Sequence, residues 1–146
     1  MLILSLFMSL LILLALSIYA RKEIYLQERV LAQMLPAVEV RNKLYAGFNG
    51  FALCLDVTRY PNTRRIIDFI SQHIEREKVL IYDISTFNTS DIAMFEGITN
   101  YYYPSLASVK NGKLNPHMIV LNTFDSDCKN RITKFIKQSE RNNEHE

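Results

Sequence analysis

The chain has 146 residues and a formal net charge of +2. This near-neutral balance offers no electrostatic attraction for nucleic acid, and the length allows one domain with a modest core beside any membrane segment. The two cysteines and three histidines lie far apart and match no spacing typical of a zinc site or a dithiol, so we expect no metal and no other cofactor.

The N-terminal segment has the composition of a membrane span. Residues 2–20 are apolar apart from three serines and one tyrosine, and Arg21 and Lys22 follow directly. A helix of this length would be ~28 Å long, close to the ~30 Å hydrocarbon thickness of a bilayer. We therefore predict a transmembrane helix over residues 1–20, with residues 2–20 in lipid. The alternative is a cleaved signal peptide, but no Lys or Arg precedes the apolar run, which is also longer than usual.

The segment between the span and the first buried strand is expected to connect them. Residues 21–35 keep an apolar spacing that suits one face of a helix, so we predict that the membrane helix continues until Pro36. Residues 36–50 contain the Asn49-Gly50 turn signal. They are interpreted as a linker or a short strand, which makes 21–50 a juxtamembrane helix and linker.

From residue 51 the pattern alternates between strands and helices. Residues 51–57 and 79–84 are continuous apolar runs of the kind found in buried parallel strands. Between them, Asn62 and Thr63 can cap an amphipathic helix that follows Pro61. A strand, a helix and a second strand in this order predict a right-handed βαβ unit.

The second half of the domain predicts a hairpin and a closing helix. A short helix between Thr89 and Gly97 precedes a strand at 105–110, and Asn111-Gly112 is a strong hairpin signal. The returning strand is expected at 117–122. The last helix is expected to be capped by Ser126 or Asp127, with residues 139–146 forming a polar tail.

This order of elements over residues 51–138 resembles that of a thioredoxin-like domain. The segment YYYPSLASVKNGKL is similar to the thioredoxin segment in which a cis-proline precedes a strand and a turn, with Pro104 as the cis-proline. The resemblance implies an α/β fold with a central mixed sheet flanked by helices. It also places Tyr60 and Thr63 where a thioredoxin carries its two cysteines. Neither side chain can exchange disulfides, so the resemblance does not extend to thioredoxin chemistry.

A narrower resemblance covers most of the chain. LALSIYARKEIYLQERVL and GKLNPHMIVLNT are similar to the membrane exit and the closing hairpin of the MauD-like, membrane-anchored group of thioredoxin-like proteins. That group assists the maturation of a bacterial periplasmic enzyme, which implies an envelope accessory protein with an extracytoplasmic domain. The basic residues after the span favour the opposite, cytoplasmic orientation. We expect a single-pass membrane protein with a periplasmic domain.

The thioredoxin resemblance brings two distant segments together as a peptide-binding groove. Its expected residues are Tyr60, Pro61, Asn62, Thr63, Tyr103 and Pro104, with a basic rim of Arg59, Arg64 and Arg65. In this fold the residue before the cis-proline offers its backbone to an extended peptide. Tyr101 to Tyr103 would surround the groove. The alternative is a vestigial groove covered by ordinary loop tyrosines.

Two carboxylates lie near this expected groove. Asp56 and Asp83 follow the two predicted parallel strands, at the sheet edge where sites in α/β proteins collect. They could serve metal or acid–base chemistry, but no third ligand stands at a recognisable spacing. Capping of the loops is the favoured interpretation.

The sequence thus predicts a membrane-anchored, redox-inactive thioredoxin-like accessory protein. It would bind a partner polypeptide during maturation or assembly of an envelope protein. The enzymatic alternative is a thiol-disulfide or peroxide oxidoreductase that uses Cys54 or Cys128 as a lone thiol, although both cysteines are expected to be buried. A third possibility is a structural membrane subunit whose domain is a docking surface.

Overall fold

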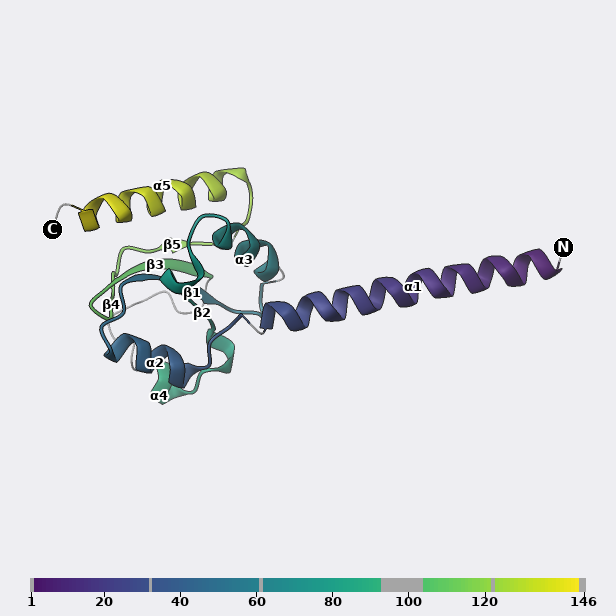
Figure 1. Ribbon diagram of the computed structural model, residues 1–146, viewed down its shortest axis with the longest axis horizontal. Helices are drawn as coiled ribbons and strands as arrows, with labels where there is room; N and C mark the ends of the chain where they lie inside the picture. Colours follow the sequence, from purple (N-terminus) through teal and green to yellow (C-terminus); the bar gives the residue numbers. More distant parts are fainter. Residues whose placement is uncertain (1, 32, 61, 93–103, 122, 145–146) are drawn as a thin grey trace. The chain divides into compact units, whose positions relative to one another are not determined.

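The structure is a computed structural model that describes residues 2–31, 33–60, 62–92, 104–121 and 123–144. The chain divides into two compact units, residues 1–33 and 34–146. The first unit contains helix α1, Leu2–Leu31, and the second contains all other helices and strands. Figure 1 shows both units with their labels.

Helix α1 is long and apolar enough to cross a membrane. Its apolar stretch, Ser5–Tyr25, is exposed along its whole length. The helix continues past Arg21 and Lys22 to Leu31, which confirms the prediction that it extends beyond the apolar run and ends before Pro36. Exposed leucines and isoleucines on every side of a helix are typical of a segment that contacts lipid.

The second unit is built on a mixed five-stranded sheet, in which β1, Gly50–Leu55, is central. The strand order is β2-β1-β3-β4, and β5 also pairs with β3. The other strands are β2, Val79–Asp83; β3, Ser105–Lys110; β4, Lys113–Leu114; and β5, Ile119–Val120. Strands β1 and β2 are parallel, as predicted, and β3 runs antiparallel to β1, β4 and β5.

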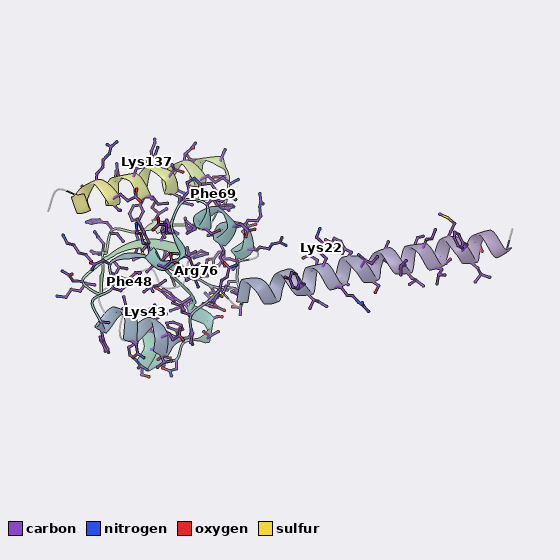
Figure 2. All side chains as sticks on the ribbon, in the orientation of Figure 1. Lys22, Lys43, Phe48, Phe69, Arg76 and Lys137 are labelled. Carbon is purple, nitrogen blue, oxygen red and sulfur yellow. The ribbon has the colours of Figure 1, made fainter. Side chains whose placement is uncertain are left out.

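Helices cover both faces of this sheet. On one face lie α2, Ala37–Tyr45, and α4, Thr89–Ile92; on the other lie α3, Thr63–Ser71, and α5, Ser126–Glu144 (Figure 1). Short 3-10 turns, Arg76–Lys78 and Ile84–Thr86, flank β2. Side chains of the sheet and of the helices lie between these layers (Figure 2). The predicted mixed sheet flanked by helices is therefore confirmed.

The alternation of side chains along β1 supplies a core to each face. Ala52 and Cys54 pack with Val40 and Leu44 of α2. Neighbouring strand residues point to opposite faces, so Phe51 lies on the other side, where its ring meets Phe135 of α5 edge-on at 6.3 Å. Every residue of β1 after Gly50 is buried. Cover on both faces explains why this strand is a continuous apolar run.

Helix α2 stands where the sequence suggested a linker or a short strand. Val40 and Leu44 are four residues apart, so a helix brings both to one face, and both are buried in the core. The N–H of Leu35 also donates to the carbonyl of Ile81 at 2.7 Å, along the outer edge of β2. Residues 34–50 therefore belong to the folded domain, and the expected linker interpretation is wrong.

The hairpin agrees with the prediction at its turn and differs after it. Asn111 and Gly112 have φ of +51° and +73°, as a type I′ turn requires, and they join Lys110 to Lys113. A two-residue strand, β4, follows the turn directly, where no strand was expected. Within the strand expected at 117–122, only Ile119 and Val120 form a strand, β5, among the described residues. Pro116 lies between β4 and β5 and has no N–H to donate to the ladder.

Both ends of α5 differ from the prediction. Asp125 caps the helix, because its Oδ1 accepts a hydrogen bond from the N–H of Cys128 at 2.8 Å. The expected cap was Ser126 or Asp127. At the other end the helix continues to Glu144, so residues 139–144 are not a frayed tail. No Gly or Pro interrupts that stretch. The expected end of the short helix near Gly97 lies outside the described residues.

Candidate functional site

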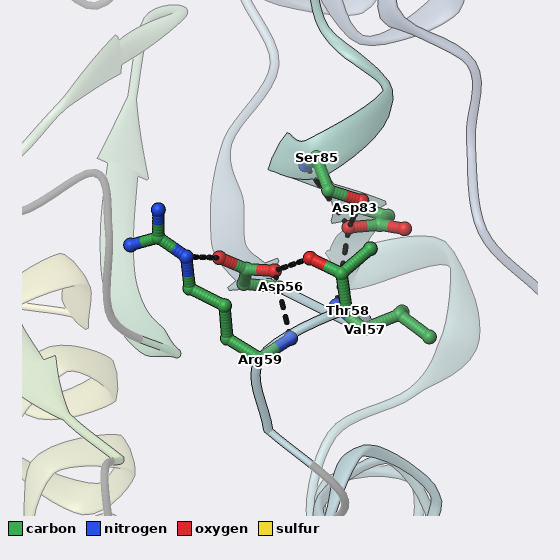
Figure 3. A network of polar contacts seen from close by, with 6 residues as sticks. All are labelled: Asp56, Val57, Thr58, Arg59, Asp83 and Ser85. Carbon is green, nitrogen blue, oxygen red and sulfur yellow. Dashed lines mark hydrogen bonds and ion pairs between the residues drawn. The ribbon is translucent and has the colours of Figure 1, made fainter.

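The loop after β1 is organised around the Asp56 carboxylate (Figure 3). Asp56 Oδ1 accepts hydrogen bonds from Thr58 Oγ1 at 2.7 Å and from the N–H of Arg59 at 3.2 Å. Its Oδ2 lies 3.6 Å from Arg59 Nε. The Asp56 carbonyl also accepts from the N–H of Tyr60 at 3.0 Å. These bonds fold residues 56–60 into a tight turn that leads towards α3.

Asp83, at the end of β2, joins two loops. Its Oδ1 accepts from Ser85 Oγ at 2.8 Å, from the N–H of Ser85 at 3.1 Å, and from the N–H of Val57 at 3.3 Å (Figure 3). The bond to Val57 crosses from β2 to the loop after β1. Both aspartates are buried and use their oxygens to hold backbone in place, which supports the capping interpretation. Among the described residues, no group of three His, Cys, Asp or Glu side chains is placed to hold a metal.

The predicted groove begins where this turn meets α3. Thr63 is buried, and its hydroxyl donates to the carbonyl of Tyr60 at 2.9 Å. Asn62, at the N-cap position, makes no side-chain capping bond. Tyr60 and Asn62 are half-buried. Pro61 and Tyr101 to Tyr103 lie outside the described residues.

Strand pairing places the second half of the predicted groove beside the first. Ser105, the first residue of β3, pairs with Cys54 of β1 on one side and with Val120 of β5 on the other. Because Pro104 directly precedes Ser105, it lies next to the end of β1, from which the Asp56 turn leaves. Pro104 is buried there. The Tyr103–Pro104 bond, expected to be cis, lies outside the described residues. The described part of the chain contains no cis peptide bond.

The three arginines of the predicted basic rim each have a partner within the chain. Arg59 pairs with Asp56, and Arg64 Nε lies 3.8 Å from Asp68 Oδ2. The guanidinium of Arg65 lies over the Phe124 ring, 5.8 Å from its centroid. Arg65 is therefore positioned by the segment that precedes α5.

Both cysteines are buried and free. Burial raises the pKa of the Cys54 thiol to about 12, and the charges of Asp83 and Asp56 act in the same direction; a hydrogen bond with the Tyr82 side chain opposes them. Burial also raises the pKa of Cys128, while Arg131 lowers it. A thiolate is the reactive form of cysteine, so neither residue has the environment of a catalytic thiol.

A cavity of about 680 Å³ lies at the opposite end of β3, away from the predicted groove. It is lined by Ser108, Val109 and Lys110 of β3; by Lys113, Leu114, Asn115, Pro116 and His117; and by Phe135, Gln138, Ser139 and Asn142 of α5. This cavity was not expected from the sequence. The available signal was the helical spacing of the four α5 residues, which continues past residue 138 into the expected tail.

Comparison of the chain with protein-family models, with curated proteins and with solved structures found no match.

Proposed function

We propose that this chain is a membrane-anchored accessory protein whose thioredoxin-like domain binds a segment of a partner polypeptide without redox chemistry. The observation that carries the proposal is the strand order β2-β1-β3 with parallel β1 and β2, antiparallel β3 and β5, and a closing helix α5. That arrangement agrees with the thioredoxin resemblance of the sequence. It sets Pro104 beside the end of β1, where a thioredoxin-like domain receives an extended peptide.

The side chains at this position support binding in place of disulfide exchange. Tyr60 and Thr63 stand at the start of α3, and the Thr63 hydroxyl is occupied by the Tyr60 carbonyl. A half-buried tyrosine supplies an apolar ring and a polar tip, a combination enriched at protein interfaces. The groove would therefore hold a peptide through aromatic and backbone contacts.

A membrane span would determine where in the cell this binding occurs. A span such as Ser5–Tyr25 would hold the domain near the membrane surface. The resemblance to MauD-type proteins favours the periplasmic side and a partner that matures or assembles in the envelope. The span would contact lipid directly, and the proposal involves neither nucleic acid nor a metal.

Site-specific photocrosslinking in cells of the producing organism tests the groove. The photoreactive residue p-benzoylphenylalanine replaces Tyr60 in the full chain, and a matched variant carries it at Tyr45, which is 80% exposed on α2. We expect a discrete crosslinked product from position 60 and none from position 45. The additional change Asn62→Arg should remove the product, because it places a large charged side chain in the groove without breaking a capping bond. Equal products from both positions, or none from position 60, would refute the proposal.

Thiol labelling tests the oxidoreductase alternative. We expect Cys54 and Cys128 in the folded chain to react with a maleimide at pH 7.5 at least about a hundredfold more slowly than in urea, because both are buried and protonated. Lys137→Cys, on the exposed side of α5 (Figure 2), provides the fast-reacting control. Labelling of either native cysteine as fast as this control would favour lone-thiol chemistry.

A further inference from the structure

We propose that the outer face of α5 binds the surface of a membrane that contains anionic phospholipid. This face consists of Asn130, Lys134, Lys137 and Arg141, which follow one another at spacings of three or four residues, so a helix places them on one side. All four side chains are exposed. The contact lies outside the peptide groove, and it depends on the membrane span and not on the groove.

The outer face points away from the core of the domain. Cys128, Ile132 and Ile136 are buried and form the opposite face of the helix. Successive residues of an α-helix are about 100° apart, so Lys134 lies about 160° around the axis from Ile132. The core therefore covers the apolar side of α5 and leaves its basic side facing solvent.

Acidic side chains do not neutralise the outer face in the described part of the chain. Ion pairs at spacings of three or four residues commonly stabilise exposed helices. No residue at these spacings from Lys134 is acidic, since the four positions hold Asn130, Arg131, Lys137 and Gln138. Lys134, Lys137 and Arg141 form no ion pair with another described residue. The outer face thus keeps positive charge that the stability of the helix does not require.

Two acidic side chains of α5 are described, and both leave this charge in place. Asp127 Oδ2 lies 3.5 Å from Arg131 Nε and is therefore already paired. Glu140 lies about 100° around the helix from Arg141. Lys137 and Arg141 are four residues apart, a spacing at which like charges destabilise a helix. An anionic surface opposite them would relieve this repulsion.

The two sides of the sheet differ in charge. Helices α3 and α5, which cover one face, contain seven basic and four acidic residues, whereas α2 and α4, on the other face, contain two of each. On the basic side, Lys129 Nζ and the Arg65 guanidinium also lie over the Phe124 ring, 5.2 and 5.8 Å from its centroid. A negatively charged surface would therefore attract the side of α3 and α5 and leave α2 facing away.

A lipid surface suits the outer face better than a protein partner does. Lysine is depleted in protein–protein interfaces, and the outer face contains no aromatic or aliphatic residue to form the centre of one. The span would keep the domain close to lipid headgroups, which raises the effective concentration for the contact. Each basic residue near an anionic membrane surface strengthens binding about fivefold, so three can hold a domain that is already nearby.

Fluorescence quenching by headgroup-labelled lipid tests this proposal. The full chain is placed in nanodiscs of phosphatidylcholine, with or without phosphatidylglycerol, that contain some phosphatidylcholine with a nitroxide on its headgroup. A fluorophore is attached through Asn130→Cys on the outer face, or through Tyr45→Cys, where the native side chain is 80% exposed on α2. The native cysteines are buried and stay unlabelled.

We expect phosphatidylglycerol to increase quenching at position 130 at least about twofold and to leave position 45 unchanged. High salt should reverse the increase, because the Debye length falls from ~10 Å at 0.1 M to ~3 Å at 1 M ionic strength.

Two double variants with the same change in net charge locate the contact. Lys134→Gln with Lys137→Gln should lower the ratio of docked to free domain at least about tenfold, because each removed charge costs about fivefold. Lys43→Gln with Lys78→Gln should leave that ratio unchanged. Figure 2 labels Lys137 on α5 and Lys43 on the opposite side of the sheet. All four lysines are exposed, so neither variant removes a core contact.

Three results would overturn the proposal. The first is quenching at position 130 that does not respond to phosphatidylglycerol, as expected if the outer face serves an acidic protein. The second is an equal increase at position 45, and the third is an equal loss in both double variants, which would indicate a general effect of net charge. None of these outcomes bears on the peptide groove, because crosslinking from position 60 measures a different surface.

Discussion

Two separate constraints require glycine at position 112: a positive φ and a close contact with the backbone of α2. Gly112 has a φ of +73°, and a Cβ at this position would overlap the backbone carbonyl of Leu44. Gly47 has a similar φ of +82°, but a Cβ there would meet nothing within 4 Å. The N–H of Gly47 donates to the carbonyl of Leu44 at the end of α2. The N–H of Gly112 donates to the carbonyl of Phe48, in the segment that follows α2.

The two glycines therefore form a matched pair for measurement. We expect Gly47→Ala to lower the free energy of unfolding by ~1 kcal/mol, the cost of a non-glycine residue at positive φ. Gly112→Ala should lower it by at least ~3 kcal/mol, because the hairpin must also move away from α2. Urea unfolding of the full chain in micelles, followed by circular dichroism, gives both values. Equal losses would show that the hairpin turn does not contact α2 closely in solution.

Asp83 is a second position where one side chain holds several backbone groups. Its Oδ1 accepts from the N–H groups of Val57 and Ser85 and from the Ser85 hydroxyl. Asp83→Ala leaves these donors without their partner, so we expect a loss of ~2 to 3 kcal/mol in the free energy of unfolding. Asp68→Ala, an exposed residue with only a 3.8 Å ion pair to Arg64, should cost ~0.5 kcal/mol or less. A similar small loss for both would mean that Asp83 is not a structural cap.

At the scale of elements, α2 decides where the folded domain begins. A chain that starts at Met34 keeps Val40 and Leu44 in the core, and it keeps the Leu35 bond to the edge of β2. A chain that starts at Phe51 exposes the sheet face that α2 covers. Burial of one valine and one leucine is worth ~1.5 to 3 kcal/mol each, a large share of the stability of a small domain.

We therefore expect residues 34–146 to give a soluble fragment with a cooperative thermal transition. Residues 51–146 should aggregate or melt without cooperativity, as measured by circular dichroism. Leu44→Ala in the longer fragment should lower its free energy of unfolding by ~2 to 4 kcal/mol, which links the effect to the core and not to fragment length. A cooperative transition in the shorter fragment would contradict the assignment of α2 to the domain.

Elements that bury continuous or strongly periodic apolar runs could be predicted from the sequence. Strands β1 and β2, helix α3 and the Asn111-Gly112 turn were expected because their own residues determine them. Helix α2 was missed because it is short, mixes polar and apolar residues, and buries only Val40 and Leu44. Tertiary packing, and not local propensity, stabilises such a helix.

The site residues show the same division. The loop-capping interpretation of Asp56 and Asp83 followed from their places at strand ends, and their hydrogen bonds agree with it. The cavity beside α5 depends on how far that helix continues over the hairpin, which the polar composition of residues 139–144 concealed. Its lysines are neighbours only because the type I′ turn pairs them.

At the scale of the whole molecule, the chain joins a helix of membrane-spanning length to a domain with its own core. Two features favour opposite orientations of that domain. Arg21 and Lys22 follow the span, and the positive-inside rule would keep them in the cytoplasm. The role proposed above, in maturation or assembly of an envelope protein, requires the domain to lie in the periplasm instead.

The buried native cysteines make this question directly measurable. Because Cys54 and Cys128 are sequestered in the folded domain, they can stay in place, and single cysteines at the exposed positions Glu75 and Lys137 provide the signal. We expect a membrane-impermeant maleimide to label both engineered positions in intact cells and to leave the unaltered chain unlabelled. Labelling only after lysis would place the domain in the cytoplasm. The partner would then have to be a cytoplasmic protein, and the basic flank would outweigh the family resemblance as a guide to orientation.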